Sequence, residues 1–322
     1  MADNPLNRLV NPRLPAAAIG LEAGEASAVL LERRRGLFTI KRAATIALPE
    51  ELLRPGFDET NIGDMNELAE ALAQLITSAG LQRQKRWSVS LPGAATRSMI
   101  ITLEGAPASR AELEEVLRWK MERSFGYPVD ELRVTKERLG ADAQGRARYV
   151  AVGVRLSVLS EYETVFAALG WRTGLILPRH LGEMQWLDKR GAGAAAKRGD
   201  SLLVSSHTEG FTAVIVRGAQ PLAVRAIICD PEDRDDELYR LLLFYRDRLA
   251  SPDESPEAYN IERLLLLGDG LKSEHVGELV SETLGVNLSV MNPADVGLAL
   301  PSAELTFDSI AAPAGLATLA WR

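Results

Sequence analysis

Near its N-terminus the chain reads AAIGLEAGEASAVLLERRRGLFTIKRAATIA, residues 17–47. Three apolar segments, residues 17–21, 26–32 and 37–47, are separated by two short polar segments that each contain a glycine. Glycine is common in tight turns because it adopts positive φ angles without steric cost. The stretch therefore predicts three antiparallel strands joined by two tight turns.

The same arrangement returns in the second half of the chain. Residues 201–206, 211–217 and 222–229 form three more apolar segments with short turns between them, and in both halves a helical pattern follows. The apolar stripes of these two helices consist of Leu68, Leu72, Leu75, Ile76 and Ala79 in the first half, and of Leu238, Leu241, Leu242, Tyr245 and Leu249 in the second. An ordered repeat of this kind predicts a duplicated α/β domain.

A different pattern interrupts the first half. It predicts a strand, a helix, two strands and a second helix at residues 98–103, 109–124, 132–138, 147–155 and 157–169. We therefore expect a small inserted α+β domain at residues 97–170. Helix starts are predicted at Asp64 and at Ser109, because each precedes a glutamate, Glu67 or Glu112, by three residues. Further strands are predicted at residues 263–267 and 287–290.

These patterns also predict how the chain is divided. The expected parts are a disordered tail at residues 1–15, a first subdomain at 16–96 that returns at 171–190, the insert at 97–170, a second subdomain at 199–306, and a C-terminal helix at 307–322 that packs on the first subdomain. The tail is predicted because it contains three prolines. A small, polar and aperiodic segment at 188–199 marks the boundary between the two subdomains.

The composition narrows the class of protein. Among 322 residues, 37 are Lys or Arg and 44 are Asp or Glu, so the formal net charge is −7. This acidic balance argues against nucleic-acid binding, which favours a basic face. Cys229 is the only cysteine, which excludes an internal disulfide and a thiolate zinc cluster. The histidines lack metal-ligand spacing and no apolar run is long enough to span a membrane, so we expect a soluble protein without a metal site.

Four stretches, taken in order, resemble the PilM family of type IV pilus assembly proteins. They are IGLEAG at residues 19–24, VSLPG at 89–93 ahead of Thr96 and Arg97, ELEEVLRW at 112–119 followed by Tyr127 and Pro128, and a C-terminal set of LGDG at 267–270, Asn292 with Pro293, and AGLA at 314–317. The resemblance implies an α/β, actin-like fold, which is a duplicated ribonuclease H-like fold, with a small inserted α+β domain. It also implies a cytoplasmic scaffold protein, peripheral to the inner membrane, whose membrane association is indirect and runs through a PilN-like protein and other pilus assembly proteins.

The resemblance also locates a nucleotide cleft, from which this sequence departs. The positions assigned to the cleft are Glu22, Gly24, Glu25, Ser205, Ser206, Gly268 and Gly270. Actin-like ATPases hold phosphates between two hairpin turns that each carry an aspartate and glycines. Here Glu22 replaces the first aspartate and Glu25 adds a second carboxylate, which repels phosphate unless a metal intervenes. The second turn reads VSSH at 204–207, without aspartate or glycine. These departures disfavour bound ATP and magnesium and predict a pseudo-ATPase with a degenerate cleft.

A second candidate site involves Arg97, Trp119 and Tyr127. Trp119 lies off the apolar stripe of its predicted helix, so it either packs in a second layer or presents an aromatic anchor to a partner. PilM proteins bind the N-terminal tail of PilN in a groove between the first subdomain and the insert. The resemblance implies that these three residues help to build that groove.

Two other functions stay open at this point. One is an actin-like ATPase or sugar-kinase-like phosphotransferase whose acidic groups come from other positions. The other is a GspL-like component of type II secretion, which shares the fold but continues into a transmembrane helix, whereas this sequence ends at Trp321 and Arg322. That difference favours the PilM-like scaffold.

Overall fold

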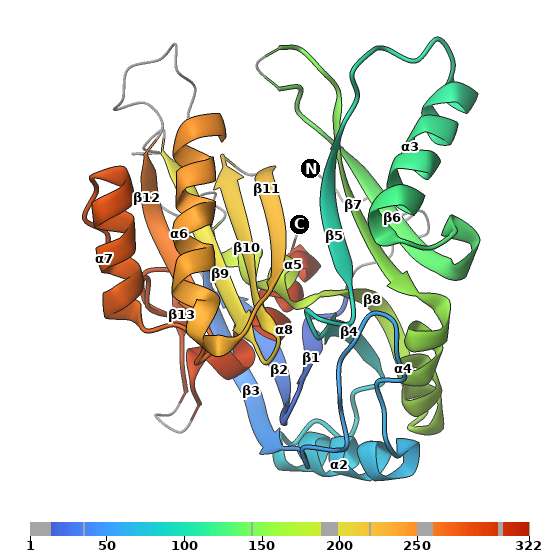
Figure 1. Cartoon of the computed structure of the whole chain (residues 1–322). Coiled ribbons are helices and arrows are strands. Elements are labelled where there is room, and N and C mark those ends of the chain that lie inside the picture. The colour runs from blue at the N-terminus through green and yellow to red at the C-terminus, as the bar shows by residue number, and fades with distance from the viewer. Residues whose placement is uncertain are drawn as a thin grey trace, which may run out of the picture.

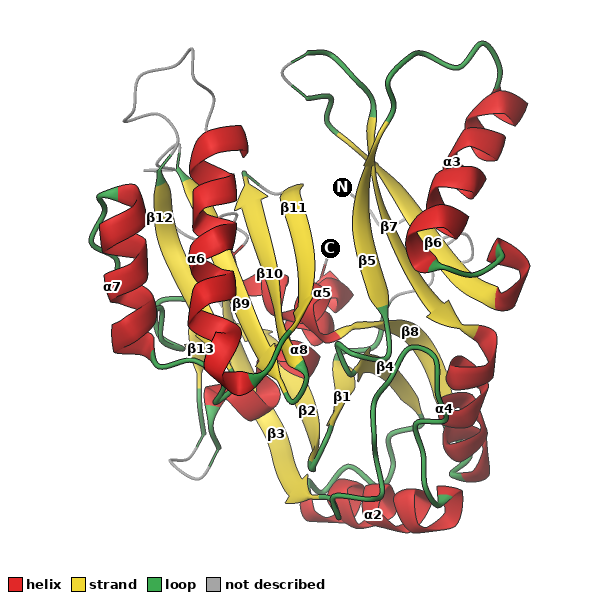
Figure 2. Ribbon diagram, in the orientation of Figure 1, coloured by secondary structure: helices red, strands yellow, loops and turns green. Residues whose placement is uncertain are grey.

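The chain forms two lobes and an inserted domain (Figures 1 and 2). The computed structural model describes residues 14–34, 36–142, 144–187, 199–218, 220–249, 260–301 and 305–321. Most of the predicted tail at residues 1–15 and of the predicted boundary segment at 188–199 lies outside the described residues. No helix in the described ranges is long and apolar enough to cross a membrane.

The first lobe is built on a six-stranded sheet with the order β13-β3-β2-β1-β4-β8. Its strands are β1 (Ala17–Glu22), β2 (Glu25–Arg34), β3 (Leu37–Ala47), β4 (Arg86–Leu91), β8 (Arg172–Pro178) and β13 (Leu298–Ala299). The first three are antiparallel, whereas β4 pairs in parallel with both β1 and β8. The three strands predicted from residues 17–47 are confirmed, while β8 and β13 lie outside the predicted strands.

Helices cover both faces of this sheet. They are α2 (Met65–Ser78) and α4 (Leu156–Ala168) on one face, and α5 (Arg179–Glu183) and α8 (Phe307–Thr318) on the other. Short 3-10 segments follow at Met184–Leu187 and Leu319–Trp321. The predicted start of α2 is confirmed, because the Asp64 carboxylate accepts hydrogen bonds from the backbone N–H groups of Asn66 and Glu67. The buried stripe of α2 then packs on the sheet.

The packing of α4 differs from the prediction that residues 97–170 form one inserted unit. The apolar face of α4, which includes Val158, Tyr162 and Phe166, is buried in the same core as α2 and β1. This helix therefore belongs to the first lobe by its packing. Its sequence gives the helical period correctly but does not show which sheet the apolar face covers.

The insert is a three-stranded antiparallel sheet with one long helix. It consists of β5 (Arg97–Thr102), α3 (Arg110–Phe125), a 3-10 turn (Val129–Glu131), β6 (Leu132–Leu139) and β7 (Arg148–Arg155), with the strand order β5-β7-β6. As predicted, Ser109 caps α3 by accepting a hydrogen bond from the N–H of Glu112. The helix covers one face of the sheet with Leu117, Met121 and Phe125.

The second lobe repeats the topology of the first. It contains β9 (Asp200–His207), β10 (Gly210–Arg217), β11 (Gln220–Ile228), a 3-10 turn (Pro231–Asp233), α6 (Arg234–Phe244), a π-helical turn (Tyr245–Leu249), β12 (Ile261–Leu267) and α7 (Ser273–Leu284). The order is β11-β10-β9-β12, and β12 runs parallel to β9 as β4 does to β1. The prediction of a short strand at residues 287–290 is wrong, because this segment makes only a single bridge, between Val290 and Leu264. The duplication predicted from the sequence is confirmed.

Candidate functional site

A cavity of about 570 Å³ lies between the two lobes. Its walls come from the β1–β2 turn, the end of β9, the turn after β12 and the start of α8. Of the residues predicted for the cleft, Glu22, Glu25, Ser206, Gly268 and Gly270 line this cavity. Gly24 and Ser205 are not among its lining residues. Ser205 is excluded because neighbouring residues of a strand point to opposite faces.

The first turn of the cleft is occupied by the protein's own charges. One oxygen of Glu22 (Oε1) accepts a hydrogen bond from the backbone N–H of Ala23 at 3.2 Å. The other (Oε2) lies 3.3 Å from Nη1 of Arg179. Nε of Arg179 in turn donates to Oε1 of Glu183 at 2.5 Å. Glu183 is fully buried and the Arg179 side chain is only 13% exposed, so this is a buried charge cluster.

Electrostatics keep the Arg179 guanidinium charged. Burial opposes the charge, but Glu183 and Glu22 outweigh it and raise the pKa of Arg179 above its usual value. Across the cavity, burial together with the nearby Arg179 and Arg234 lowers the pKa of His207 to about 4, although Glu183 acts in the opposite direction. At neutral pH the cleft therefore holds charged arginines and a neutral His207.

The second turn and the turn after β12 are covered by Arg234. Its Nη2 donates to the carbonyl oxygens of His207 at 2.8 Å and Thr208 at 3.1 Å. A Cβ atom placed on Gly270 would lie 1.9 Å from Nη1 of Arg234, so the arginine lies directly against that glycine. The N–H of Gly268 donates to the carboxylate of Asp308, whose pKa is raised by burial. Each of these turns thus contacts a side chain of the protein.

These contacts decide whether a magnesium nucleotide fits the cleft. Phosphate binding needs open backbone N–H groups, but those of Ala23 and Gly268 already donate to Glu22 and Asp308. A metal site needs available carboxylates, but Glu22 is paired with Arg179. The described residues also contain no cluster of three or more groups suited to hold a metal. These internal contacts of Glu22, Ala23 and Gly268 disfavour magnesium and a nucleotide in this arrangement.

A larger groove of about 1580 Å³ runs beside the cleft. One wall is the loop at residues 50–59 of the first lobe, a second is β5 of the insert, and a third is β11. Glu161 of α4 fixes the loop by accepting hydrogen bonds from the N–H groups of Asn61 at 2.8 Å and Ile62 at 2.9 Å. His207 lines both the groove and the cleft, so the two cavities are neighbours.

Two of the predicted partner residues meet where the loop joins the insert. Arg97 lies over the ring of Phe57 at 4.2 Å and contacts Asp58 at 3.3 Å. Arg155 lies over the ring of Tyr127 at 4.3 Å, and the Tyr127 ring centroid is 6.0 Å from that of Phe57. A hydrogen bond to the Asp58 carboxylate, together with burial, raises the pKa of Tyr127. Arg97 lines the groove, whereas Tyr127 is not among the residues that line it.

Trp119 lies elsewhere. It is 55% exposed on α3, with the guanidinium of Arg123 over its ring at 5.5 Å, and it does not line the groove. The structure therefore does not bring Trp119 together with Arg97 and Tyr127. The helical position off the apolar stripe left open a second packing layer or exposure, and the ring is exposed.

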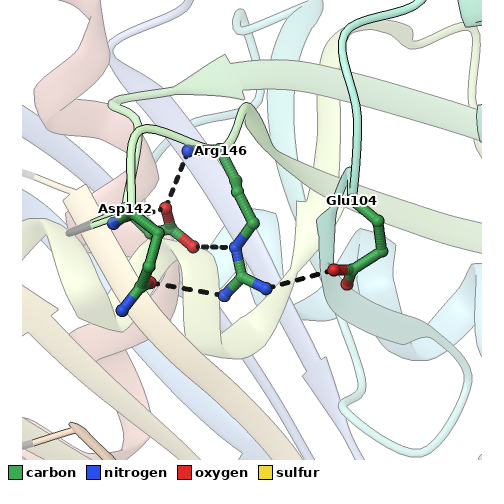
Figure 3. Close-up of polar contacts among 4 residues, drawn as sticks. Glu104, Asp142 and Arg146 are labelled. Carbon is green, nitrogen blue, oxygen red and sulfur yellow. Dashed lines mark hydrogen bonds and ion pairs between the residues drawn. The ribbon is translucent and has the colours of Figure 1, made fainter.

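The β6–β7 loop also lines the groove, and Figure 3 shows the polar contacts that hold this loop. Arg146 holds this loop, because its Nε lies 2.7 Å from Oδ2 of Asp142 and its Nη1 lies 3.2 Å from Glu104. The same loop reaches the second lobe, where the N–H of Gly140 donates to Oε1 of Gln220 at 2.7 Å.

Arg148 also connects the insert to the second lobe, because its guanidinium donates to the carbonyl of Leu222 at 2.7 Å. Burial lowers the pKa of Arg148, although nearby Asp142 acts in the opposite direction.

Several residues of both cavities have no signal in the sequence patterns. Arg234 and Asp308 line the cleft, Phe57 and Asp58 line the groove, and none of the four belongs to a motif. A signal existed for Arg179 and Glu183, since a basic and an acidic residue four apart follow a proline that starts a helix. The others meet only through the fold.

Comparisons with known proteins show which fold this is. No protein-family model and no curated protein sequence matches the chain. Among solved structures, a chain of a "PilM-PilN type IV pilus biogenesis complex" aligns with a TM-score of 0.75 at 21% identity, covering 97% of this chain and 100% of that one. A Bacteroides thetaiotaomicron protein with an actin-like ATPase fold and unknown function aligns with a TM-score of 0.50 at 11% identity, covering 86% of this chain and 91% of that one. The chain therefore has an actin-like fold with an inserted domain, and the resemblance to PilM proteins is confirmed at the level of the fold.

Proposed function

We propose that this protein is a cytoplasmic scaffold of type IV pilus assembly, peripheral to the inner membrane, that docks on the N-terminal tail of a PilN-like membrane protein. The proposal rests on the groove between the first lobe and the insert, which is the place that the PilM resemblance assigns to this tail. The end-to-end structural similarity to a chain of a PilM–PilN complex supports it. Other pilus assembly proteins are further proposed partners, and exposed Trp119 is a candidate contact for them.

The charges of the groove suit such a tail. Its loop wall carries Glu50, Glu51, Asp58 and Glu59 against one arginine, Arg54. The other walls are basic, with Arg97 on β5 and further arginines at positions 146, 148, 217, 225 and 248. A cytoplasmic tail next to a membrane span is commonly rich in Lys and Arg, and its free amino terminus adds positive charge. Acidic residues along the wall therefore attract it, and we expect its binding to weaken as salt increases.

The degenerate cleft supports a scaffold rather than an enzyme. The acid at the position of the first-turn aspartate, Glu22, is paired with Arg179, and the second turn carries His207 in place of an acid. Phosphoryl transfer depends on positioning a metal and the phosphates, so we propose a pseudo-ATPase.

The test is isothermal titration calorimetry of the whole chain with a synthetic peptide of the PilN-like tail encoded in the same genome, and separately with Mg-ATP. We expect peptide binding and no heat from Mg-ATP. ATP binding with turnover and no peptide binding would contradict the scaffold and favour the ATPase.

A pair of variants locates the site. We expect Arg97→Ala to weaken peptide binding about tenfold, because the guanidinium that lies over Phe57 and contacts Asp58 holds the loop wall of the groove in place. Trp119→Ala is the matched control, since its ring lies outside the groove. Loss of peptide binding in Trp119→Ala, with Arg97→Ala unaffected, would place the site on α3 instead.

A further inference from the structure

We infer that Arg179 is a built-in substitute for the divalent cation of the cleft: its guanidinium neutralises the carboxylates of Glu22 and Glu183 where an actin-like ATPase would use a metal ion. The inference rests on the degenerate cleft of the proposed function and is independent of peptide docking. It gives the Glu22 carboxylate of the first turn a structural role, which a degenerate cleft alone does not.

The geometry is that of one cation held by two acids. Glu22 ends β1 and Glu183 ends α5, and both carboxylates contact the same guanidinium, at 3.3 Å and 2.5 Å. A buried carboxylate is unstable without a compensating charge. Two carboxylates that share one cation create the electrostatic setting that divalent metals also satisfy.

The cluster is not electrically complete. Two carboxylates and one guanidinium give a formal charge of −1, and Oε2 of Glu183 is buried without a hydrogen-bond partner among the described residues. His207 does not supply the missing charge, because burial together with Arg179 and Arg234 keeps it neutral, although Glu183 acts in the opposite direction. A site that already has excess negative charge would become a cation site if its arginine were removed.

Chemical rescue tests this. In Arg179→Ala the two carboxylates lose their cation, so we expect the Tm to fall by roughly 5 to 10 °C. Addition of 10 mM MgCl₂ or MnCl₂ should then recover several degrees, whereas KCl at matched ionic strength should not. The wild-type chain should show no Mg²⁺-dependent or Mn²⁺-dependent change in Tm and no Mn²⁺ binding by calorimetry.

Two further variants keep the test decisive. Arg179→Lys retains a cation, and we expect a small loss of Tm and no response to Mg²⁺. The double variant Glu22→Gln with Arg179→Gln leaves Glu183 as the one carboxylate of the two that contacted Arg179. It should therefore also lose the metal response. Metal binding by the wild type, or a folded Arg179→Ala without any metal-dependent gain, would overturn the inference. The function proposed above fails by a separate result, which is absence of peptide binding.

Discussion

At the scale of single residues, His207 has the most testable electrostatics. It ends β9 and lines both the cleft and the groove, and burial is the main reason that its pKa falls to about 4. In the unfolded chain the pKa of histidine is about 6.5. Between pH 6.5 and 4 the unfolded state therefore binds more protons than the folded state, so stability falls as the pH falls. We expect His207 to lower the free energy of unfolding by roughly 2 kcal/mol between pH 7.5 and pH 4.5.

Urea unfolding at both pH values measures this. The loss of stability at pH 4.5 should be smaller in His207→Gln than in the wild type. Part of the loss should remain in the variant, because burial also lowers the pKa of His180 to about 4. His275→Gln is the control, because this histidine is half exposed on α7 and does not line the cleft. Equal losses in all three chains would show that His207 is not the titrating group.

The sequence predicts residues of the cleft only where a motif carries them. Glu22, Gly268 and Gly270 follow strands that the apolar pattern already predicts, and the structure places them in one cavity. Arg179 and Arg234 contact the turns that line the cavity, yet each is the first residue of a helix and belongs to no turn motif. Their role depends on which turns they reach across the lobe, and no local pattern contains that information.

At the scale of elements, the crossing of α5 and α8 depends on two glycines. A Cβ atom on Gly315 would lie 1.9 Å from the carbonyl oxygen of Gly182, which is closer than real contacts allow. We therefore expect Gly315→Ala to separate the helices and reduce the free energy of unfolding by about 1 to 3 kcal/mol. Chemical denaturation measures the change.

A matched glycine on another helix gives the opposite expectation. On α7, a Cβ atom on Gly277 would have its nearest neighbour at 3.7 Å, an ordinary contact. Because alanine favours helix over glycine, Gly277→Ala should stabilise the chain by roughly 0.5 to 1 kcal/mol. A stabilising Gly315→Ala would mean that α5 and α8 do not pack as closely as described.

Elements were predictable where a period or a cap was present. Asp64 and Ser109 mark the starts of α2 and α3, and both act as caps in the structure. β8 has no such signal, since its residues RTGLILP neither alternate nor carry a turn motif at their start. Its partner β4 sets its register, and that is a contact distant in sequence.

At the scale of the whole molecule, the insert is connected to both lobes. Arg155 of the insert donates to the carbonyl of Asp58 in the first lobe at 2.9 Å. Arg148 and Gly140 contact the second lobe through Leu222 and Gln220. The duplicated pattern predicts two lobes and an insert, but these contacts arise only once the chain has folded. Through these contacts the insert connects the first lobe to the second lobe.

The bridge to the second lobe can be removed without touching the first. In Arg148→Ala combined with Gln220→Ala, the carbonyls of Pro221 and Leu222 lose the Arg148 guanidinium as their donor. The β6–β7 loop also loses the hydrogen bond from Gly140 to Gln220. We expect hydrogen exchange to increase in β5, β11 and the β6–β7 loop, and the radius of gyration from small-angle scattering to rise. Arg138→Ala, an exposed arginine on the insert strand β6, is the control and should change neither. Unchanged exchange in the double variant would mean that β5 and β11 are held together by apolar packing alone, with Ile100 and Val224 in their shared core as the remaining contact.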